Sequence, residues 1–364
     1  IAVIGDGVET IREIIENYNR NRMNDIVGIA FRKDGKIILT KRRELLPLDM
    51  MPFPKVELFR NIDKYTGYLP NSRKREFLTY TSLGCPYRCV FCFKQYGDLV
   101  RFRSPERVIE EIYYYIEKFN VKSIYFFDWV FGLDEKRTLD FLDKFIREKL
   151  NEKISWKCFS RADLSERLLE RMREAGCELI NFGVESGSQK ILDRIGKGIT
   201  LEKVKKTVKI AKSLGIKVEL NFIIGHPEEK REDVKKTEEI IFQLEPDFLN
   251  ISILTPLPGT KIWKMALEKR SGLYLRIEEP DKINWSEFGW KTGKILGHSF
   301  LGNLQILEAR LYARFYLRPS RIKNLFNIVG LKTLFLYIYH LLKDIFTYFL
   351  KNGKRQKRDR NRVF

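Results

Sequence analysis

Cysteine is scarce in this sequence, and nothing in it indicates export. The chain has five cysteines in 364 residues, and three of them fall within eight positions. This distribution excludes the disulfide framework of a small secreted protein. The first residues, from Ile1 onward, have a strand pattern without a charged leading region, so we interpret them as part of a longer chain and not as a signal peptide. We therefore expect a reducing, cytoplasmic compartment.

A long apolar run free of charges is also missing. The most apolar stretch, residues 325–350, is interrupted by charged residues that include Lys332 and Asp344, which argues against a transmembrane helix. A helix lying in a membrane interface fits better, followed by a basic tail, 351–364, that would contact anionic lipid. A helix packed on the rest of the protein, with a solubilising tail, explains the same pattern.

Acidic residues are outnumbered by basic ones. The chain has 48 Asp and Glu against 68 Lys and Arg, a net charge of +20, which favours an anionic partner such as nucleic acid or a membrane surface. With 44% hydrophobic and 32% charged residues the composition is that of a globular protein. The length allows two domains, or one large domain with extensions.

Three of the cysteines form one motif, Cys85-x3-Cys89-x2-Cys92. So tight a run cannot supply three core positions of a strand or helix, so we expect a loop wrapped around a bound group. Thiolates this close converge on a soft metal or an iron–sulfur cluster. No fourth cysteine lies nearby, because Cys158 and Cys177 fall in a predicted strand and at a predicted helix end, so one coordination position would stay open for chemistry. A structural zinc loop and unconnected core cysteines are the alternatives.

From position 76 onward, strand patterns alternate with helical patterns. Six strands, each followed by a helix, predict an α/β fold with a parallel sheet. Right-handed crossovers allow such a sheet to curl into a barrel, with functional residues at the carboxyl ends of its strands. The expected strands are 77–83, 123–127, 154–160, 179–184, 217–224 and 248–254. The expected helices are 105–119, 135–150, 165–175, 190–195 with 201–214, and 231–244, and a further one at 306–317.

The cysteine motif, with Phe91 directly before its third cysteine, resembles the radical S-adenosylmethionine (SAM) enzymes. The resemblance implies an incomplete (β/α)6 barrel and a [4Fe–4S] cluster held by Cys85, Cys89 and Cys92. It also implies that SAM chelates the open iron. Reduction by an external electron donor would then split SAM into methionine and a 5′-deoxyadenosyl radical, which abstracts a hydrogen atom. Phe91 would lie near the adenine.

Further motifs of this family follow at the expected strand ends. Asp128 matches an acid that contacts the SAM amino group, with a helix N-cap as the alternative. Arg161 would pair with the SAM carboxylate, or form a structural salt bridge. Glu185, in a G-x-E-S-G pattern, would accept hydrogen bonds from the ribose or pair with Arg161, with a buried structural role as the alternative. Gly225 belongs to a turn expected near the adenine, and His226 beside it has either a structural or a proton-transfer role. The resemblance leaves the catalytic residues unknown.

The N-terminal region resembles the end of the cobalamin-binding domain that precedes many radical SAM domains. The glycine turn 5–10 and the proline-rich linker 47–54 carry this resemblance. The D-x-H-x-x-G loop of such domains is not present and no histidine precedes position 226, so cobalamin binding would need a site supplied by sequence N-terminal to this chain. We expect three parts: 1–70, the remnant and its linker; 71–270, the radical SAM core; and 271–364, a helical extension with the apolar helix and basic tail.

The resemblance implies an enzyme that cleaves SAM reductively and then methylates, couples or cyclises its substrate. The apolar and basic C-terminal region favours a lipid or another hydrophobic small molecule, with peripheral membrane contact through 325–364, and nucleic acid is not expected. A methylthiotransferase-like enzyme acting on tRNA would suit the charge, but its usual upstream cysteines and downstream RNA-binding barrel are not visible. A non-catalytic iron–sulfur or zinc-binding protein is another alternative, against which the intact strand-end motifs argue.

Overall fold

The centre of the protein is a curved parallel sheet of six strands. The computed structural model describes residues 1–17, 22–62, 74–94, 98–276 and 296–321. The strand order is β11-β10-β9-β8-β7-β4, and each neighbouring pair is parallel. The strands are β4 (Glu76–Thr79), β7 (Ser123–Phe126), β8 (Ser155–Arg161), β9 (Cys177–Glu185), β10 (Lys217–Ile224) and β11 (Phe248–Ile253). This confirms the predicted α/β fold with an incomplete barrel.

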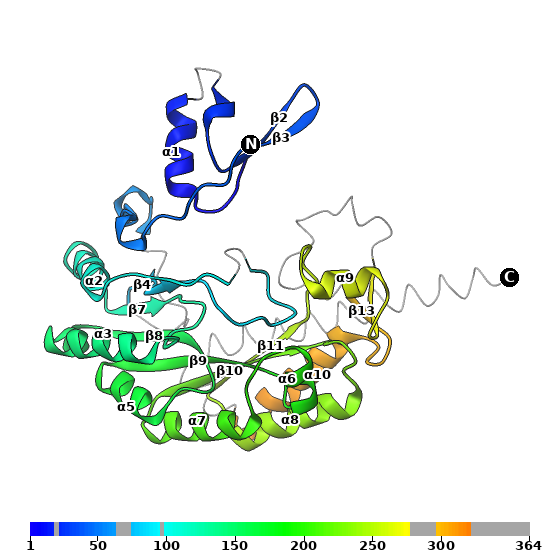
Figure 1. The fold of residues 1–364 in the computed structure, drawn as a ribbon. Coiled ribbons are helices and arrows are strands. Elements are labelled where there is room, and N and C mark those ends of the chain that lie inside the picture. Colours follow the sequence, from blue (N-terminus) through cyan, green and yellow to red (C-terminus); the bar gives the residue numbers. More distant parts are fainter. Residues whose placement is uncertain (18–21, 63–73, 95–97, 277–295, 322–364) are drawn as a thin grey trace.

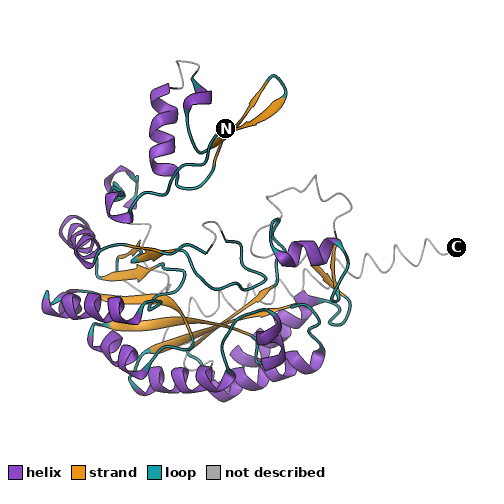
Figure 2. Ribbon diagram, in the orientation of Figure 1, coloured by secondary structure: helices purple, strands orange, loops and turns teal. Residues whose placement is uncertain are grey.

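Helices cover the outer face of this sheet, as Figures 1 and 2 show. They begin where the sequence supplies caps: Ser104 and Asp134, for example, accept hydrogen bonds from backbone N–H groups in the first turns of α2 and α3. The main helices are α2 (Pro105–Phe119), α3 (Glu135–Arg147), α5 (Glu166–Glu174), α7 (Leu201–Ser213) and α8 (Arg231–Leu244). Shorter helices are α4 (Leu150–Lys153), α6 (Gln189–Arg194) and α9 (Lys261–Leu267), and α9 lies apart from this layer, near β13, in Figure 1.

The hydrophobic core lies between the sheet and these helices. In β10, Val218, Leu220, Phe222 and Ile224 are buried, while the residues between them are only half-buried on the inner face. An aromatic group that includes Phe126, Phe131 and Trp156 fills the corresponding layer behind β7 and β8. Alternation of apolar and polar residues along each strand therefore separates a packed outer face from an inner face that is free to carry polar groups.

Helix α10 (Leu304–Tyr316) closes the open edge of the sheet at β11. The Tyr316 hydroxyl accepts from the backbone N–H of Leu249 at 2.9 Å and donates to its carbonyl at 3.0 Å. Tyr312 does the same for Ile251, at 2.7 and 3.0 Å. The two tyrosines are four residues apart, which is about 6 Å along a helix, and Leu249 and Ile251 are two residues apart, which is about 6.6 Å along a strand. The spacing of the tyrosines therefore matches the spacing of the backbone groups that they contact. The tyrosines satisfy backbone groups that an edge strand would otherwise leave unpaired.

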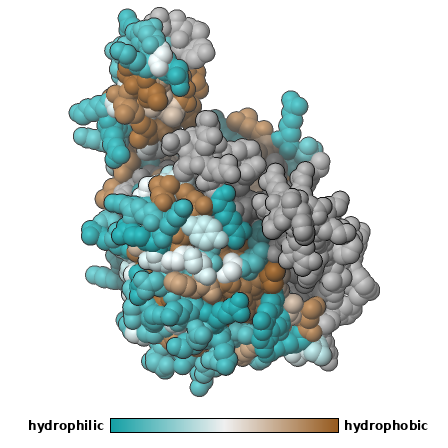
Figure 3. All heavy atoms as spheres, turned by 90° about the vertical axis from the view of Figure 1, so that its right-hand side faces the viewer, coloured by the Kyte–Doolittle hydropathy of each residue, from teal (hydrophilic) through white to brown (hydrophobic). Residues whose placement is uncertain are grey.

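The N-terminal residues form a separate small unit above the barrel in Figure 1. It contains β1 (Ala2–Val3), α1 (Gly7–Asn17) and the hairpin of β2 (Ile29–Lys33) and β3 (Lys36–Leu39), which turns at Asp34-Gly35. The N-terminal region and its linker also contain three short 3-10 helices: η2 (Met23–Asp25), η3 (Leu48–Met50) and η4 (Val56–Leu58). Apolar residues reach the surface of this unit in Figure 3.

Two short antiparallel ribbons complete the described fold. One pairs β5 (Ser82–Leu83) with β6 (Arg101–Phe102), and the other pairs β12 (Leu273–Leu275) with β13 (Leu296–His298). Among the helices of the described residues, none has the length and apolar character needed to cross a membrane. The predicted interfacial helix and basic tail, 325–364, lie outside the described residues.

Two predictions about local structure were wrong. The single strand expected at 77–83 is broken, because β4 ends at Thr79 and β5 turns away to pair with β6. Cys177, expected at the end of a helix, is the first residue of β9, since the preceding Gly176 has a φ of +89° that ends the helical region.

Candidate active site

The three-cysteine loop leaves the β5–β6 ribbon through a position that only glycine can occupy. Gly84 has a φ of +101°, and a Cβ there would lie 2.0 Å from the carbonyl oxygen of Leu99. The loop therefore turns sharply at its start and its two ends stay in contact. Figure 1 shows the segment after β5, in cyan, extending over the inner side of the sheet, where the carboxyl ends of the strands meet.

The three thiols of this loop are free and half-buried. Burial raises the pKa of Cys89 and of Cys92, and for Cys92 the neighbouring Cys89 and Cys85 thiols raise the pKa further. For Cys89, the nearby Lys197 ammonium is the largest effect in the opposite direction. Both thiols are therefore protonated at neutral pH in the protein without a bound group, and coordination of metal would release their protons.

The loop packs on the turn after α6, residues 195–198. The backbone N–H of Val90 donates to the carbonyl of Ile195 at 3.0 Å, and the Cys89 thiol lies 3.7 Å from the carbonyl of Gly196. Gly196 and Gly198 have φ values of +66° and +64°, which direct successive carbonyls of this turn toward different partners. A turn distant in sequence thus holds the middle of the cysteine motif in place.

Arg161, at the end of β8, donates to the same turn. Its Nη1 lies 2.8 Å from the carbonyl of Lys197 and its Nη2 lies 3.0 Å from that of Gly198. The guanidinium also pairs with Asp163 at 3.0 Å and lies 3.7 Å from the centre of the Tyr87 ring in the cysteine loop. The structural salt bridge considered for this residue is therefore present, with Asp163 as partner. The structure places Arg161 against the cysteine loop, and its pairing with the SAM carboxylate stays a prediction.

Glu185, at the end of β9, forms a buried ion pair with Lys197. The Glu185 Oε1 and Lys197 Nζ atoms are 2.8 Å apart, and both side chains are about nine-tenths buried. The pairing of Glu185 with Arg161 that the sequence allowed is wrong, because Lys197 occupies that place. Glu185 has a φ of +76°, an uncommon conformation for a residue with a side chain. Sequence reasoning missed Lys197, and its only signal was its place in the Gly196-Lys197-Gly198 turn.

Gly225 begins the turn after β10. Its φ is +92°, a conformation that favours glycine, and a Cβ there would press against the end of the Leu304 side chain at 2.9 Å. Its N–H donates to Glu229 Oε2 at 2.6 Å. Burial raises the pKa of Glu229 to about 8, and Oε1 of this side chain has no hydrogen-bond partner. The turn is thus held by a carboxyl group that is mostly protonated at neutral pH.

His226 connects this turn to the cysteine loop. Its ring centre lies 5.9 Å from that of Phe91, and its Nε2 lies 3.3 Å from the backbone carbonyl of Glu185. Because a carbonyl oxygen only accepts, Nε2 carries the proton in this contact. Burial lowers the pKa of His226 to about 4, so the ring is neutral. These contacts favour the structural role considered for His226, whose ring contacts both Phe91 and the backbone of Glu185.

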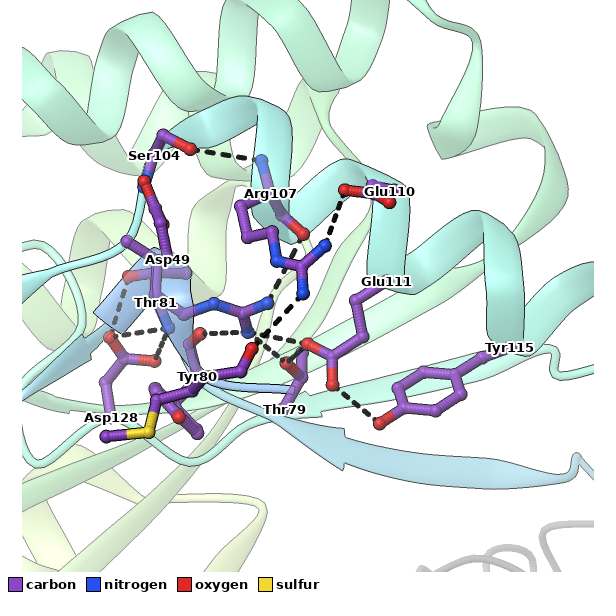
Figure 4. Close-up of polar contacts among 12 residues, drawn as sticks. Asp49, Thr79, Tyr80, Thr81, Ser104, Arg107, Glu110, Glu111, Tyr115 and Asp128 are labelled. Atoms are coloured by element: carbon purple, nitrogen blue, oxygen red, sulfur yellow. Dashed lines mark hydrogen bonds and ion pairs between the residues drawn. The ribbon is translucent and has the colours of Figure 1, made fainter. Parts of the chain in front are cut away.

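Asp128 lies under the stem of the cysteine loop and not among these residues. Its carboxylate accepts from the N–H of Thr81 at 2.9 and 3.2 Å, from the Thr81 hydroxyl at 2.7 Å and from the Ser82 hydroxyl at 2.6 Å. Figure 4 shows Asp128 beside Thr81, in the same view as Glu111, which forms a buried ion pair with Arg103 at 2.6 Å. Burial raises the pKa of Asp128, while these hydrogen bonds oppose the shift. The carboxylate is fully engaged by the protein, so its contact with SAM stays a prediction.

Comparison with known proteins identifies the family. The sequence profile of the Radical SAM superfamily matches residues 79–241. PH0819 of Pyrococcus horikoshii, an uncharacterized methyltransferase, is 34% identical over 336 residues, which cover 90% of this chain and 70% of that protein. This chain belongs to the radical SAM superfamily. Its members are enzymes that bind a [4Fe–4S] cluster and SAM, so these are the cofactors of this protein, and its catalysis is radical SAM chemistry.

Other relatives of this radical SAM protein differ in their named activities. MJ0865 of Methanocaldococcus jannaschii, named as a methylthiotransferase, is 28% identical over 88% of this chain and 71% of its own length. The anaerobic magnesium-protoporphyrin IX monomethyl ester cyclase of Rubrivivax gelatinosus is 27% identical over 72% of this chain and 48% of its own length.

Two solved structures share the fold. The cobalamin-dependent radical SAM enzyme OxsB with aqua-cobalamin bound superposes with a TM-score of 0.68, at 21% identity, over 92% of this chain and 54% of that chain. The radical SAM methyltransferase TsrM from Kitasatospora setae, with tryptophan and a SAM analogue bound, superposes with a TM-score of 0.64, at 17% identity, over 76% of this chain and 56% of that one. This radical SAM chain spans little more than half of either.

The residues of the radical SAM loop fit the cluster. Three thiols on one loop, free of disulfides and half-buried, are the donor set that such a cluster uses. Among the described side chains, no three of the types His, Cys, Asp and Glu come close enough together to hold a single metal ion. Lys197 and Arg161 place two buried cations beside this loop, each paired with a carboxylate, Glu185 and Asp163 respectively.

Proposed function

We propose that this enzyme uses SAM-derived radical chemistry to methylate, couple or cyclise a hydrophobic small molecule or lipid. The observation that carries the proposal is the convergence of the three-cysteine loop with the Glu185–Lys197 pair and Arg161 at the carboxyl ends of β8 and β9. Cys85, Cys89 and Cys92 are its cluster ligands. When bound, the reduced cluster supplies the electron that cleaves SAM to methionine and a 5′-deoxyadenosyl radical.

The residues of the chain orient SAM and keep water away from it. Phe91 and Gly225 line the adenine side, where the His226 ring and the glycine turn meet the loop. Glu185, fixed by Lys197, accepts hydrogen bonds from the ribose, and Arg161 faces the SAM carboxylate. Asp128 would contact the SAM amino group, while its carboxylate also holds the loop stem. Enclosure of the site protects a reactive radical from side reactions.

Methyl transfer is the reaction class that the relatives favour. PH0819 is named as a methyltransferase, and the protoporphyrin ester cyclase and the TsrM complex with tryptophan extend the range to large planar and aromatic small molecules. Residues 1–70 would belong to a cobalamin-binding-like domain, with the core at 71–270 and a helical extension at 271–364 that contacts the membrane through 325–364. Cobalamin would need a site from N-terminal sequence, and an external donor would supply electrons in the cytoplasm.

The test is product analysis with the cluster rebuilt in the absence of oxygen. SAM, a strong reductant and cobalamin are added, and 5′-deoxyadenosine and S-adenosylhomocysteine are quantified. Deoxyadenosine that disappears in the Cys85→Ala/Cys89→Ala/Cys92→Ala variant, and persists in Cys177→Ala, supports the proposed ligands. Adenosylhomocysteine formed beside it supports methyl transfer. No SAM turnover from iron-loaded wild-type protein would overturn the proposal.

A methylthiotransferase remains the second candidate because of the similarity to MJ0865. It predicts that sulfur and a methyl group both enter the product, which mass spectrometry separates from methylation alone by the added mass. A non-catalytic binding protein is distinguished by metal and sulfide analysis. Zinc without sulfide in the purified protein would favour that alternative over the enzyme.

A further inference from the structure

The three cysteines are carried by a loop whose stem is very short. β5 and β6 have two residues each, and they pair Ser82 with Phe102 and Leu83 with Arg101. A two-stranded ribbon is marginally stable at best in water. The order of this stem, and with it the position of the thiols, therefore has to come from the surrounding protein.

One strand of the stem is attached to the barrel. Asp128 receives four hydrogen bonds from Thr81 and Ser82, at the start of β5. On the other side, Arg137 of α3 donates to the carbonyl of Thr81 at 3.2 Å. Both the N–H and the carbonyl of Thr81 thus have side-chain partners. Asp128 is almost completely buried, and Arg137 is more than half buried.

The other strand is attached to the N-terminal unit. Arg101 Nη1 lies 2.7 Å from Asp6 Oδ2, and Nη2 lies 3.0 Å from Oδ1, a bidentate pair. Nη1 also donates to the carbonyl of Leu46 at 2.7 Å. The side chains of Asp6 and Arg101 are 7% and 12% exposed. Buried bidentate contacts of this kind are strong and fix orientation, so the position of β6 depends on the residue that directly precedes α1.

The contact extends along the chain on both sides of this pair. The Asp49 carboxylate accepts from the N–H of Ser104 at 2.8 Å, and Arg107 donates to the carbonyl of Met51 at 3.2 Å. The Arg107 guanidinium lies 3.7 Å from the centre of the Phe53 ring. Figure 4 shows Asp49 beside the residues that follow the stem. The N-terminal unit and its linker therefore contact the stem and the start of α2 continuously.

We propose that the N-terminal unit holds the stem of the cysteine loop through the Asp6–Arg101 ion pair, and that this pair sets how firmly the loop retains its cluster. Asp6 and Arg101 are positioning residues, since the proposal has them act on the cysteines through the stem that carries the loop. The claim that the ion pair controls cluster retention rests on the proposed ligation of the cluster by Cys85, Cys89 and Cys92. The claim that the ion pair orders the stem does not depend on that ligation.

Three variants and one control test this in the full chain. Asp6→Asn keeps the shape of the side chain but removes its charge. Arg101→Gln removes the other partner, and the double variant removes both. The control is Glu9→Gln in α1, three residues after Asp6, whose half-buried side chain pairs with the exposed Arg12 at 2.8 Å. The first readout is the rate of tryptic cleavage after Arg88, a residue of the loop with an 82% exposed side chain, in protein without a cluster.

The second readout is the anaerobic rate of iron transfer from reconstituted protein to a ferrous chelator. Loss of a buried charge pair should accelerate both rates by about tenfold or more in Asp6→Asn and Arg101→Gln. The double variant should be no faster than the faster single variant, because both changes remove one interaction. The control should stay within about twofold of wild type.

Equal rates in Asp6→Asn and Glu9→Gln would overturn the proposal. So would faster cleavage after Arg88 that is matched at sites throughout the barrel, because that pattern reports global unfolding. If wild-type protein fails to bind iron through the three cysteines, the proposed ligation is wrong, but cleavage after Arg88 still decides whether the N-terminal unit orders the stem. The two proposals therefore fail in distinguishable ways.

Discussion

Lys197 and Glu185 form an ion pair, 2.8 Å between Nζ and Oε1, that is buried under the cysteine loop. The carboxylate comes from a residue with a φ of +76°, a conformation that costs of the order of 1–3 kcal/mol outside glycine. Removal of one partner from such a pair leaves an uncompensated buried charge. The pair therefore holds Glu185 in a strained position at the end of β9, where we propose that it meets the ribose of SAM.

Lys197→Met should weaken SAM binding by about tenfold or more, because Glu185 loses its orientation. Lys203→Met, an exposed change on α7, is the control and should bind SAM as wild type does. Equilibrium binding to reconstituted protein measures this. The variant Glu185→Gln/Lys197→Met removes both charges, so it should recover thermal stability without recovering SAM binding. Recovery of binding in this double variant would show that the pair has only a structural role.

The five thiols should fall into two classes toward an alkylating reagent. Cys158 and Cys177 are fully buried, and burial together with the adjacent Cys177 thiol raises the pKa of Cys158 well above its ordinary value. Cys85, Cys89 and Cys92 are half-buried. In folded protein without a cluster, at mildly alkaline pH, these three should react while the buried pair stays protected.

Mass spectrometry of the alkylated peptides gives the reaction rate at each cysteine. Denaturant should expose Cys158 and Cys177 and abolish the difference, which serves as the control. Reaction of Cys158 at the rate of the loop cysteines would contradict the described core.

Glu229→Gln should change how stability depends on pH. The pKa of Glu229 is raised from 4.5 to about 8, so between these values the folded state holds a proton that the unfolded state lacks. Stability conferred at this site therefore falls as pH rises, by at most about 1.4 kcal/mol per pH unit. Gln mimics the protonated acid and should remove this dependence.

Chemical denaturation between about pH 5 and pH 9 is the measurement, because this range brackets the shifted pKa. The advantage of Glu229→Gln over wild type should grow with pH. Glu239→Gln, an exposed change on α8, should run parallel to wild type. A constant difference between Glu229→Gln and wild type would show that the carboxyl group is ionised throughout.

Tyr316→Phe should lower the free energy of unfolding by about 1–3 kcal/mol, because it leaves the N–H and carbonyl of Leu249 without their partner. Tyr312→Phe should act in the same way on Ile251. Both variants reopen the β11 edge and should aggregate more readily. Tyr274→Phe, in the β12–β13 ribbon, is the control. Denaturation and light scattering measure the two effects, and stability equal to the control would mean that water replaces the hydroxyl groups.

Local patterns predicted the regular elements well. The ranges expected for α2, α8 and β10 coincide with the structure, because each combines a clear apolar period with a cap, proline or glycine at its ends. The β5–β6 stem could not be found this way. Two-residue strands have no period, and their pairing joins positions 82 and 102, across the whole cysteine loop.

The sequence by itself determined the family, the order of strands and helices, and which three cysteines are the candidate cluster ligands. Each of these depends on residues close together in the chain. Tertiary structure alone decided which charges meet. Lys197 reached Glu185 through a glycine turn, Arg161 took Asp163 as its ionic partner, and Asp128 turned to the loop stem. The physical reason is that a buried charge takes the partner that folding brings within hydrogen-bond distance, and that distance is a property of the packed strands.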